Sequence, residues 1–286
     1  MGFKISVIIV NYNTEELLAE CISSLQSQQL YIYEIIVVDN ASVDRSVAMV
    51  RERFPFVHLV ALSENIGFGR ANNLAFEKCS GKLLFLLNPD TRVLPGCLGA
   101  IQHYMMEHPE VGMAGTAICD EKQVLQTTVH NEYPGSHYGG KLFSDLPGDV
   151  AWLLGASLVL RREVLEQIQG FDSDFFLYGE DIDLGLRIRK ASWPLGYIPE
   201  ARIIHLEGQS ERTTPQEALF EKKMRAELLF YHKHYPPETV RRIKKIRRLQ
   251  ALWRIATLWL SGLLGKENET ALEKRIKYSV AARVYR

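Results

Sequence analysis

The sequence predicts an α/β protein with a mostly parallel, Rossmann-like central sheet flanked by helices and followed by a C-terminal helical appendage. Between residues 5 and 87, β-rich runs alternate with segments whose apolar residues recur at helical spacing. Such alternation is typical of parallel strands joined by right-handed crossovers. The clearest strand is 83–87, five consecutive apolar residues that indicate burial on both faces.

The expected elements follow in chain order. Residues 120–150 are rich in Gly, Pro, His and Tyr and predict loops. We expect strands at 5–10, 34–38, 57–62, 83–87, 111–118, 152–162 and 196–204, and helices at 15–28, 44–54, 96–106 and 163–167, with further helices ending at Lys78 and beginning near Glu180.

Composition divides the chain into two parts of opposite charge. The 286 residues are 47% hydrophobic and 24% charged, which is typical of a globular protein. Up to Pro215 there are 17 basic and 27 acidic residues, a net charge of −10, whereas the remainder has 17 basic and 7 acidic residues, a net charge of +10. We predict an α/β domain at 1–215 and a basic, amphipathic helical region at 216–286.

Cysteine usage and the N-terminus predict a cytoplasmic location. The four cysteines form neither a CxxC pair nor a zinc-like spacing, which favours buried thiols in a reducing compartment. The sequence starts directly in a strand pattern, so we expect no secretory signal peptide.

Four polar loops follow the first four predicted strands. They carry Asn11 and Tyr12, Asp39, the segment 65–73, and 88–90. Ligands of open α/β sheets bind at the carboxyl ends of the strands. Each loop also has an ordinary structural interpretation, as a turn, a helix cap or packing. Together they suit a nucleoside diphosphate, with an aromatic face for a base, polar groups for ribose, and an arginine and a helix N-terminus for phosphate.

Two later features are candidates for chemistry. Glu180 and Asp181 follow an aromatic run and a glycine. They are either acids favoured by the dipole of a first helical turn or a general base in a pocket. His205 ends a predicted strand, where it is either structural or a metal ligand.

Taken together, residues 1 to about 215 resemble family 2 glycosyltransferases of the GT-A fold, and within them the rhamnosyltransferase-like branch. The resemblance rests on the order and spacing of several motifs. These are 10–13 (VNYN), 38–42 (VDNAS), 65–73 (NIGFGRANN), 88–90 (NPD), 155–156 (GA), 171–172 (FD), 175–184 (FFLYGEDIDL) and 205–208 (HLEG).

The resemblance implies roles for individual residues. Asp90 would bind Mg²⁺ or Mn²⁺ with His205 as a candidate second ligand, and Asp181 would be the catalytic base, with Glu180 beside it. Asn88 stands where the family carries the first acid of a D-x-D motif, so it would bond ribose or a metal-bound water. Asp39 would contact the pyrimidine or ribose and Tyr12 the base. The remaining residues assigned to the nucleotide sugar are Asn11, Asn65, Gly67, Arg70, Asn72, Gly155 and Ala156.

The implied activity is a metal-dependent, inverting transfer of a sugar from a dTDP- or UDP-sugar to a glycan or glycolipid acceptor in cell-surface polysaccharide synthesis. Rhamnose is the first expectation for the sugar. A sugar nucleotidyltransferase would need a glycine-rich phosphate loop after its first strand, where this chain has 11–13 (NYN). A non-catalytic carbohydrate-binding relative would have no use for both Asp90 and Asp181.

The basic tail predicts helices at 220–234 and 240–264. In the second, an apolar stripe lies opposite seven basic residues between Arg241 and Arg254. This helix either packs on the α/β domain or lies on an anionic membrane surface, with Trp253 and Trp259 at the headgroup boundary. Nucleic acid is not an expected partner because the basic residues lack interleaved stacking aromatics. The residues of the stripe are Val240, Ile243, Ile246, Leu249 and Trp253.

Overall fold

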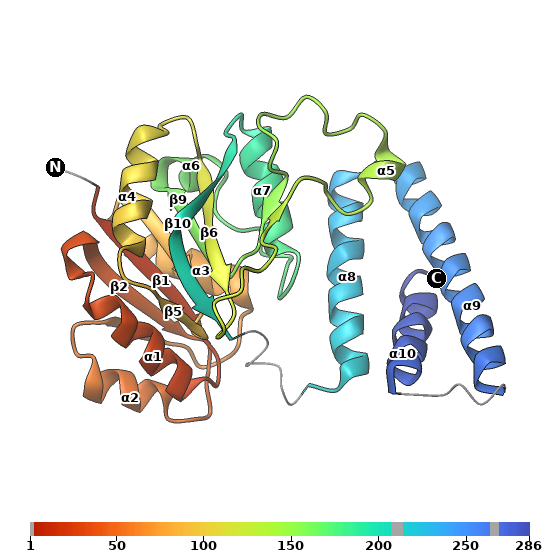
Figure 1. Ribbon diagram of the computed structural model, residues 1–286, viewed down its shortest axis with the longest axis horizontal. Coiled ribbons are helices and arrows are strands. Elements are labelled where there is room, and N and C mark those ends of the chain that lie inside the picture. The colour runs from red at the N-terminus through yellow and green to blue at the C-terminus, as the bar shows by residue number, and fades with distance from the viewer. Residues whose placement is uncertain (1–2, 207–213, 264–268) are drawn as a thin grey trace. The chain divides into compact units, whose positions relative to one another are not determined.

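The computed structural model describes residues 3–206, 214–263 and 269–286 (Figure 1). The chain forms two compact units, which we call the α/β unit and the helical unit. The α/β unit contains Met1–Tyr133, Leu146–Phe176 and Glu180–Arg212, and the helical unit contains Pro134–Asp145, Leu177–Gly179 and Thr213–Arg286. The domain boundary at residue 215 stays a prediction.

The α/β unit is built on an eight-stranded sheet in the order β3-β2-β1-β4-β9-β6-β10-β5. A two-stranded ribbon, β7 with β8, stands apart from it. The strands are β1 (Ile5–Asn11), β2 (Ile32–Asp39), β3 (His58–Ala61), β4 (Leu83–Leu87), β5 (Thr91–Val93), β6 (Met113–Cys119), β7 (Val129–His130), β8 (Trp152–Leu153), β9 (Ser157–Arg161) and β10 (Leu195–His205).

Helices cover both faces of this sheet (Figure 1). Within β4, Leu83, Phe85 and Leu87 belong to one core cluster and Leu84 and Leu86 to the other, as strand alternation requires. One cluster draws on α1, α2 and α4 and the other on α3, α6 and α7. The helices of this unit are α1 (Glu15–Gln26), η1 (Gln29–Tyr31), α2 (Ser46–Arg53), α3 (Phe68–Lys78), α4 (Cys97–Glu107), α6 (Arg162–Gln167) and α7 (Glu180–Lys190).

The sheet is more mixed than the sequence predicts. The strand expected at 152–162 is two strands, because the chain leaves the ribbon after β8 and enters the main sheet only at β9. β9 lies antiparallel between β4 and β6. Because β9 runs against β4, its first residues lie beside the carboxyl end of β4, with Ser157 opposite Leu87.

A short strand that the sequence does not predict completes this edge. β5 follows β4 after a turn and pairs antiparallel with the end of β10, with Thr91 opposite His205. β10 is parallel to β6, so its last residue reaches the same edge of the sheet as the last residues of β1, β2 and β4. We call this the carboxyl edge.

A buried arginine anchors α7. The guanidinium of Arg189 donates to the carbonyls of Pro147 (2.9 Å) and Gly148 (2.7 Å) and to the hydroxyl of Tyr133 (3.1 Å). Because these carbonyls lie in a loop, the arginine supplies hydrogen-bond partners that the loop backbone lacks. The last turn of α7 is therefore attached to the loop that precedes β8.

The helical unit contains α5 (Ser136–Gly139), α8 (Gln216–His234), α9 (Pro237–Leu263) and α10 (Glu269–Val284). The helices expected at 220–234 and 240–264 correspond to α8 and α9, apart from Leu264, which lies outside the described residues. α10 was not predicted. In the described parts of the chain, no helix combines the length and the apolar character needed to cross a bilayer.

The predicted apolar stripe of α9 is only partly buried. Val240 and Ile243 are buried in the helical unit, but Leu249 and Trp253 are 56% and 59% exposed. The stripe therefore packs at the start of the helix and faces solvent further along. The sequence pattern could not distinguish these halves, because both have the same helical spacing.

Truncation of a core side chain in β4 tests this account of the sheet. Phe85→Ala should lower the free energy of unfolding by about 3–5 kcal/mol, because Phe85 is fully buried and the change leaves a cavity. The measurement is urea unfolding followed by circular dichroism. Phe56→Ala is the matched control, since Phe56 is exposed and should cost less than about 1 kcal/mol. Equal losses in the two variants would contradict the assignment of β4 to the core.

Candidate active site

The segment that follows β4 is held by backbone hydrogen bonds on both sides. The amide of Asn88 donates to the carbonyl of Ala156 (3.0 Å), and the amide of Leu206 donates to the carbonyl of Asp90 (3.0 Å). The hydroxyl of Thr91 also donates to the carbonyl of Asn88 (2.7 Å). Residues 88–90 are thus fixed between the start of β9 and the end of β10.

Asp90 and His205 form a pair at this edge. Oδ1 of Asp90 lies 3.2 Å from Nε2 of His205, and the residues are 6% and 8% exposed. The pairing of β5 with β10 brings them together, because Thr91 lies opposite His205. Nδ1 of His205 is buried and has no hydrogen-bond partner among the residues that the structure describes.

This pair fits a divalent cation of the Mg²⁺ or Mn²⁺ type. A carboxylate oxygen and an imidazole nitrogen are both suitable metal ligands. Nδ1 of His205 has no hydrogen-bond partner among the described residues, so the imidazole has an unsatisfied ring nitrogen. Within residues 3–206, 214–263 and 269–286 no group of three His, Cys, Asp or Glu side chains could hold a metal. Two protein ligands are sufficient where substrate phosphate oxygens and water complete the coordination, as is usual for Mg²⁺.

Asp39 ends β2 in a network of hydrogen bonds. Its Oδ1 accepts from the side-chain amide of Asn11 (2.8 Å) and its Oδ2 from the backbone amide of Ser42 (2.9 Å). Asn11 is its direct neighbour across the β1–β2 pairing. Both side chains are buried, so they form a rigid wall at the ends of two adjacent parallel strands.

The loop before α3 is shaped by Asn65 and Gly67. Oδ1 of Asn65 accepts from the side-chain amide of Asn40 (2.9 Å) and from the backbone amide of Gly67 (3.0 Å). Gly67 has φ +88°, and a Cβ there would lie 2.6 Å from the carbonyl oxygen of Phe176. The next residue, Phe68, donates its amide to that same carbonyl (2.8 Å). Only glycine allows this close approach.

Three other predicted residues have different surroundings. Asn72 is buried and donates to the carbonyl of Phe68 within its own helix (3.0 Å). Nε of Arg70 donates to the carbonyl of Ser173 (3.0 Å) while the residue stays exposed. Tyr12 is 38% exposed at the end of β1. The hydrogen bonds of Arg70 and Asn72 therefore give these two residues structural partners.

Asp181 is attached to the carboxyl edge through Gly155. Oδ2 of Asp181 accepts from the backbone amide of Gly155 (3.1 Å), and its Oδ1 accepts from the amide of Ile182 (2.9 Å). A Cβ on Gly155 would lie 3.3 Å from Cβ of Asp181, which is tighter than ordinary packing. Because Ala156 is bonded to Asn88, two successive backbone contacts link Asp181 to the segment that carries Asp90.

Burial changes the ionisation of the two acids that open α7. Burial raises the pKa of Asp181 to about 6, although the amides of Gly155 and Ile182 act in the opposite direction. Burial and the nearby charge of Asp181 raise the pKa of Glu180 to about 8. Oε2 of Glu180 has no partner in the described chain. Burial thus disfavours the charged form of both acids, and the charge of each affects the ionisation of the other.

The residues predicted from the sequence thus lie in two groups at the same edge. The first group surrounds the end of β4 and contains Asn88, Asp90, Gly155, Ala156, Glu180, Asp181 and His205. The second group follows β1, β2 and β3 and contains Asn11, Asp39, Asn65 and Gly67. Part of the 205–208 motif, beyond Leu206, lies outside the described residues.

The sequence did not predict a stacked aromatic pair near this edge. The rings of His130 in β7 and Trp152 in β8 are parallel, with centroids 3.8 Å apart and 5° between the ring planes. Nε1 of Trp152 donates to the carbonyl of Glu132 (3.1 Å), and β8 leads directly to Gly155. Residues distant in sequence form this pair, so the only local signal was the tryptophan.

Solved structures with similar architecture are GT-A glycosyltransferases, and this chain has that fold. The mannosyltransferase PcManGT from Pyrobaculum calidifontis, solved with GDP-Man and Mn²⁺, matches with a TM-score of 0.60 and 17% identity, over 99% of this chain and 87% of that one. GalNAc-T7, solved with UDP, GalNAc and Mn²⁺, also matches with a TM-score of 0.60 at 15% identity, over 75% of this chain but only 45% of its own.

Sequence comparisons identify the family. The model of glycosyl transferase family 2 matches residues 6–169, more than half of the chain. The chain therefore belongs to glycosyl transferase family 2, which confirms the predicted family and enzyme class. Among its relatives is the N-acetylglucosaminyl-diphospho-decaprenol L-rhamnosyltransferase of Mycobacterium tuberculosis, 26% identical over 74% of this chain and 79% of the relative. The amylovoran biosynthesis glycosyltransferase AmsE of Erwinia amylovora is 29% identical over 68% and 73%.

The raised pKa of Asp181 predicts a pH-dependent effect of its replacement on stability. In the folded protein the ionised form is disfavoured, so stability is lost as the pH rises from the ordinary pKa of 3.8 through about 6. Asp181→Asn lacks this loss, and its melting temperature should rise relative to the wild type between pH 4 and pH 7. The measurement is thermal unfolding of both proteins across this range. A constant difference in melting temperature would show that Asp181 does not titrate there.

Proposed function

We propose that this chain is an inverting, metal-dependent glycosyltransferase that takes a sugar from a nucleoside diphosphate donor. The observation that carries the proposal is the connection of Asp181, through Gly155 and Ala156, to the segment that bears Asp90. This connection supports a site in which a general base and the leaving-group side share one edge of the sheet.

Asp181 is the proposed base. A sugar hydroxyl becomes an effective nucleophile when its proton is removed as it attacks, and a carboxylate that is ionised at neutral pH accepts that proton. The oxygen forms a bond to the anomeric carbon from the face opposite the nucleotide, and the bond to the diphosphate breaks with its electron pair. The configuration of the carbon is therefore inverted. Glu180, its neighbour in the first turn of α7, is the second candidate for the role.

Asp90 and His205 are the proposed ligands of Mg²⁺ or Mn²⁺. When bound there, the ion would act as a Lewis acid that neutralises negative charge on the departing diphosphate. Asn88 contributes a neutral oxygen on the same segment, suited to ribose or to a metal-bound water. The structures of PcManGT and GalNAc-T7 were both solved with Mn²⁺, which supports a divalent ion in the shared fold.

The second group of residues would bind the nucleoside. Asp39 and Asn11 offer polar atoms at the ends of β2 and β1, and Tyr12 offers an exposed aromatic ring for the base. Asn65 and Gly67 shape the loop that leads to the start of α3, where backbone amides favour phosphate. Arg70 is proposed as an additional phosphate contact. Asn72 is also proposed to contact the donor, through side-chain atoms other than the hydrogen that it donates to the carbonyl of Phe68.

The proposed donor and acceptor follow the named relatives. We propose rhamnose from dTDP-rhamnose, with UDP-sugars as the second donor class, and a lipid-linked or glycan acceptor in the synthesis of cell-surface polysaccharide. Support comes from the Mycobacterium rhamnosyltransferase, whose name specifies a diphospho-decaprenol acceptor, and from AmsE, whose name specifies amylovoran biosynthesis.

A peripheral position on the cytoplasmic face of a membrane is part of the proposal. Four basic residues in the first half of α9 are exposed, and exposed apolar residues follow them on the same helix. Anionic headgroups attract the basic side chains, and the boundary between headgroups and acyl chains accommodates the apolar ones. The four cysteines are free thiols, which agrees with a reducing compartment. The exposed basic residues of this first half are Arg241, Arg242, Lys245 and Arg248, and the apolar ones that follow are Leu249, Leu252, Trp253, Trp259 and Leu260.

Replacement of the proposed base tests the mechanism. Asp181→Asn should lower kcat by about a hundredfold or more, because general-base catalysis contributes about 10²–10⁴ in rate. Binding of the nucleotide should persist. In the wild type, kcat/KM should fall about tenfold per pH unit below about 6, since the protonated carboxyl cannot accept a proton.

Glu180→Gln is the companion variant, because it retains a neutral side chain of the same size. It should lose less than about tenfold in kcat. If Asp181→Asn turned over normally, or if Glu180→Gln were the more damaged variant, the assignment of the base would be wrong.

Replacement of the proposed metal ligand tests the other side of the site. Asp90→Asn should weaken Mn²⁺-dependent binding of dTDP or UDP by roughly tenfold or more. The substitution removes the negative charge that Asp90 contributes to the Asp90–His205 pair. Isothermal titration calorimetry with and without Mn²⁺ measures this. The control is Asp149→Asn, which changes an exposed acid of the same unit. Metal-dependent affinity that survives in Asp90→Asn would exclude Asp90 as a ligand.

A further inference from the structure

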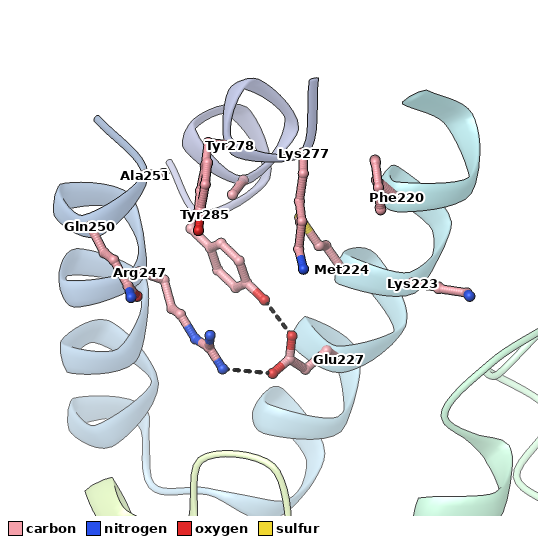
Figure 2. A pocket seen from close by; sticks show the side chains of 11 residues that line it. Phe220, Lys223, Met224, Glu227, Arg247, Gln250, Ala251, Lys277, Tyr278 and Tyr285 are labelled. Carbon is pink, nitrogen blue, oxygen red and sulfur yellow. Dashed lines mark hydrogen bonds and ion pairs between the residues drawn. The ribbon is translucent and has the colours of Figure 1, made fainter. Parts of the chain in front are cut away.

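We propose that an open cavity of the helical unit binds the anionic phosphate headgroup of a membrane lipid. The cavity lies between α8, α9 and α10 and has a volume of about 420 Å³ (Figure 2). This volume is within the range of small-molecule sites. Its wall includes Phe220, Lys223, Met224 and Glu227 from α8, Arg247, Gln250 and Ala251 from α9, and Lys277, Tyr278, Ala281 and Tyr285 from α10.

The charge of the cavity wall favours an anion. It contains three cationic side chains and a single carboxylate, that of Glu227. This carboxylate is already used, because it accepts hydrogen bonds from the hydroxyls of Tyr231 and Tyr285 and from Nη2 of Arg247 (3.1 Å). Glu227 therefore orients Arg247. It does not neutralise the other two cationic side chains of the wall, Lys223 and Lys277.

Two cationic side chains of the wall can meet a ligand. The guanidinium of Arg247 lines the cavity while its Nη2 is held by Glu227 (3.1 Å). The ammonium of Lys277 lies 6.0 Å from the centre of the Phe220 ring, and no carboxylate of the described residues forms an ion pair with it. In Figure 2, Lys277 points into the space between α10 and α8, whereas Lys223 points away from it. A guanidinium and an ammonium are the usual partners of phosphate oxygens.

The rest of the wall favours a ligand with an apolar part. Met224 and the rings of Phe220, Tyr278 and Tyr285 provide apolar surface beside these donors (Figure 2). An inorganic phosphate ion would leave this surface without a partner. The glycerol and first methylene groups of a lipid would cover it, and the phosphate would meet Lys277 and Arg247.

The exposed apolar residues of α9, the helix that forms one wall of the cavity, favour a membrane lipid as the ligand. Gln250 and Ala251 line the cavity, and the residues on either side of them, Leu249 and Leu252, are exposed together with Trp253. These apolar side chains would lie at the level of the acyl chains when the basic half of α9 meets anionic headgroups. A membrane in contact with this exposed surface of α9 is therefore the proposed source of the lipid.

The test titrates the full chain with soluble, short-chain phosphatidic acid below its micelle concentration and follows binding by isothermal titration calorimetry. Phosphatidylcholine with the same chains and inorganic phosphate form the comparison arms. We expect saturable binding of phosphatidic acid, and at least tenfold weaker binding of the other two. Equal binding of phosphatidylcholine would overturn the requirement for an anion, and equal binding of inorganic phosphate would overturn the requirement for a lipid.

Two variants of α10 locate the site. Lys277→Gln should weaken binding of phosphatidic acid at least tenfold, whereas Lys277→Arg should retain it. Lys274→Gln removes the same charge from an exposed residue one turn away that does not line the cavity, and should bind as the wild type does. Unchanged affinity in Lys277→Gln, or equal loss in both Gln variants, would overturn the proposal. Because the site is independent of sugar transfer, nucleotide binding should be the same in all three variants.

Discussion

The active-site edge depends on the backbone pairing of the segment that follows β4. The amide of Asn88 is bonded to Ala156 on one side, and the carbonyl of Asp90 is bonded to Leu206 on the other. These bonds exist because β9 and β10 reach the same edge from different directions, one antiparallel to β4 and the other parallel to β6. A side chain on such a segment has little freedom, which is what preorganised chemistry requires.

The different roles proposed for Asp90 and Asp181 follow from this constraint. Asp90 lies beside His205, where a cation and a diphosphate would meet, and Asp181 is attached to the same edge by the amide of Gly155. Burial raises the pKa of Asp181 to about 6, and burial with the nearby charge of Asp181 raises the pKa of Glu180 to about 8. Neighbouring carboxyls with shifted pKa values are a recurrent feature of acid–base sites.

The sequence predicted the parts of the site that depend on local pattern. Asp39 and Asp90 were predicted at one edge because each follows a buried strand of a parallel sheet, and their environment agrees with that. It did not predict β5 or the direction of β9, because both are set by pairing with strands far away in the chain. It also assigned one continuous stripe to α9, although burial depends on which neighbours cover each half. Family resemblance, in turn, supplied the roles that pattern alone could not.

The most direct test of the account is paramagnetic broadening of backbone amide signals by Mn²⁺ in the presence of dTDP or UDP. If the ion binds at Asp90 and His205, the amides of Asn88 and Leu206 should broaden most in the wild type, and Asp90→Asn should abolish the effect at the same ion concentration. Amides at the start of β10, near Leu195 and at the other end of that strand from His205, serve as the internal reference. Broadening that is absent from residues 88–90, or that persists unchanged in Asp90→Asn, would contradict a metal-dependent donor site at this edge of the sheet.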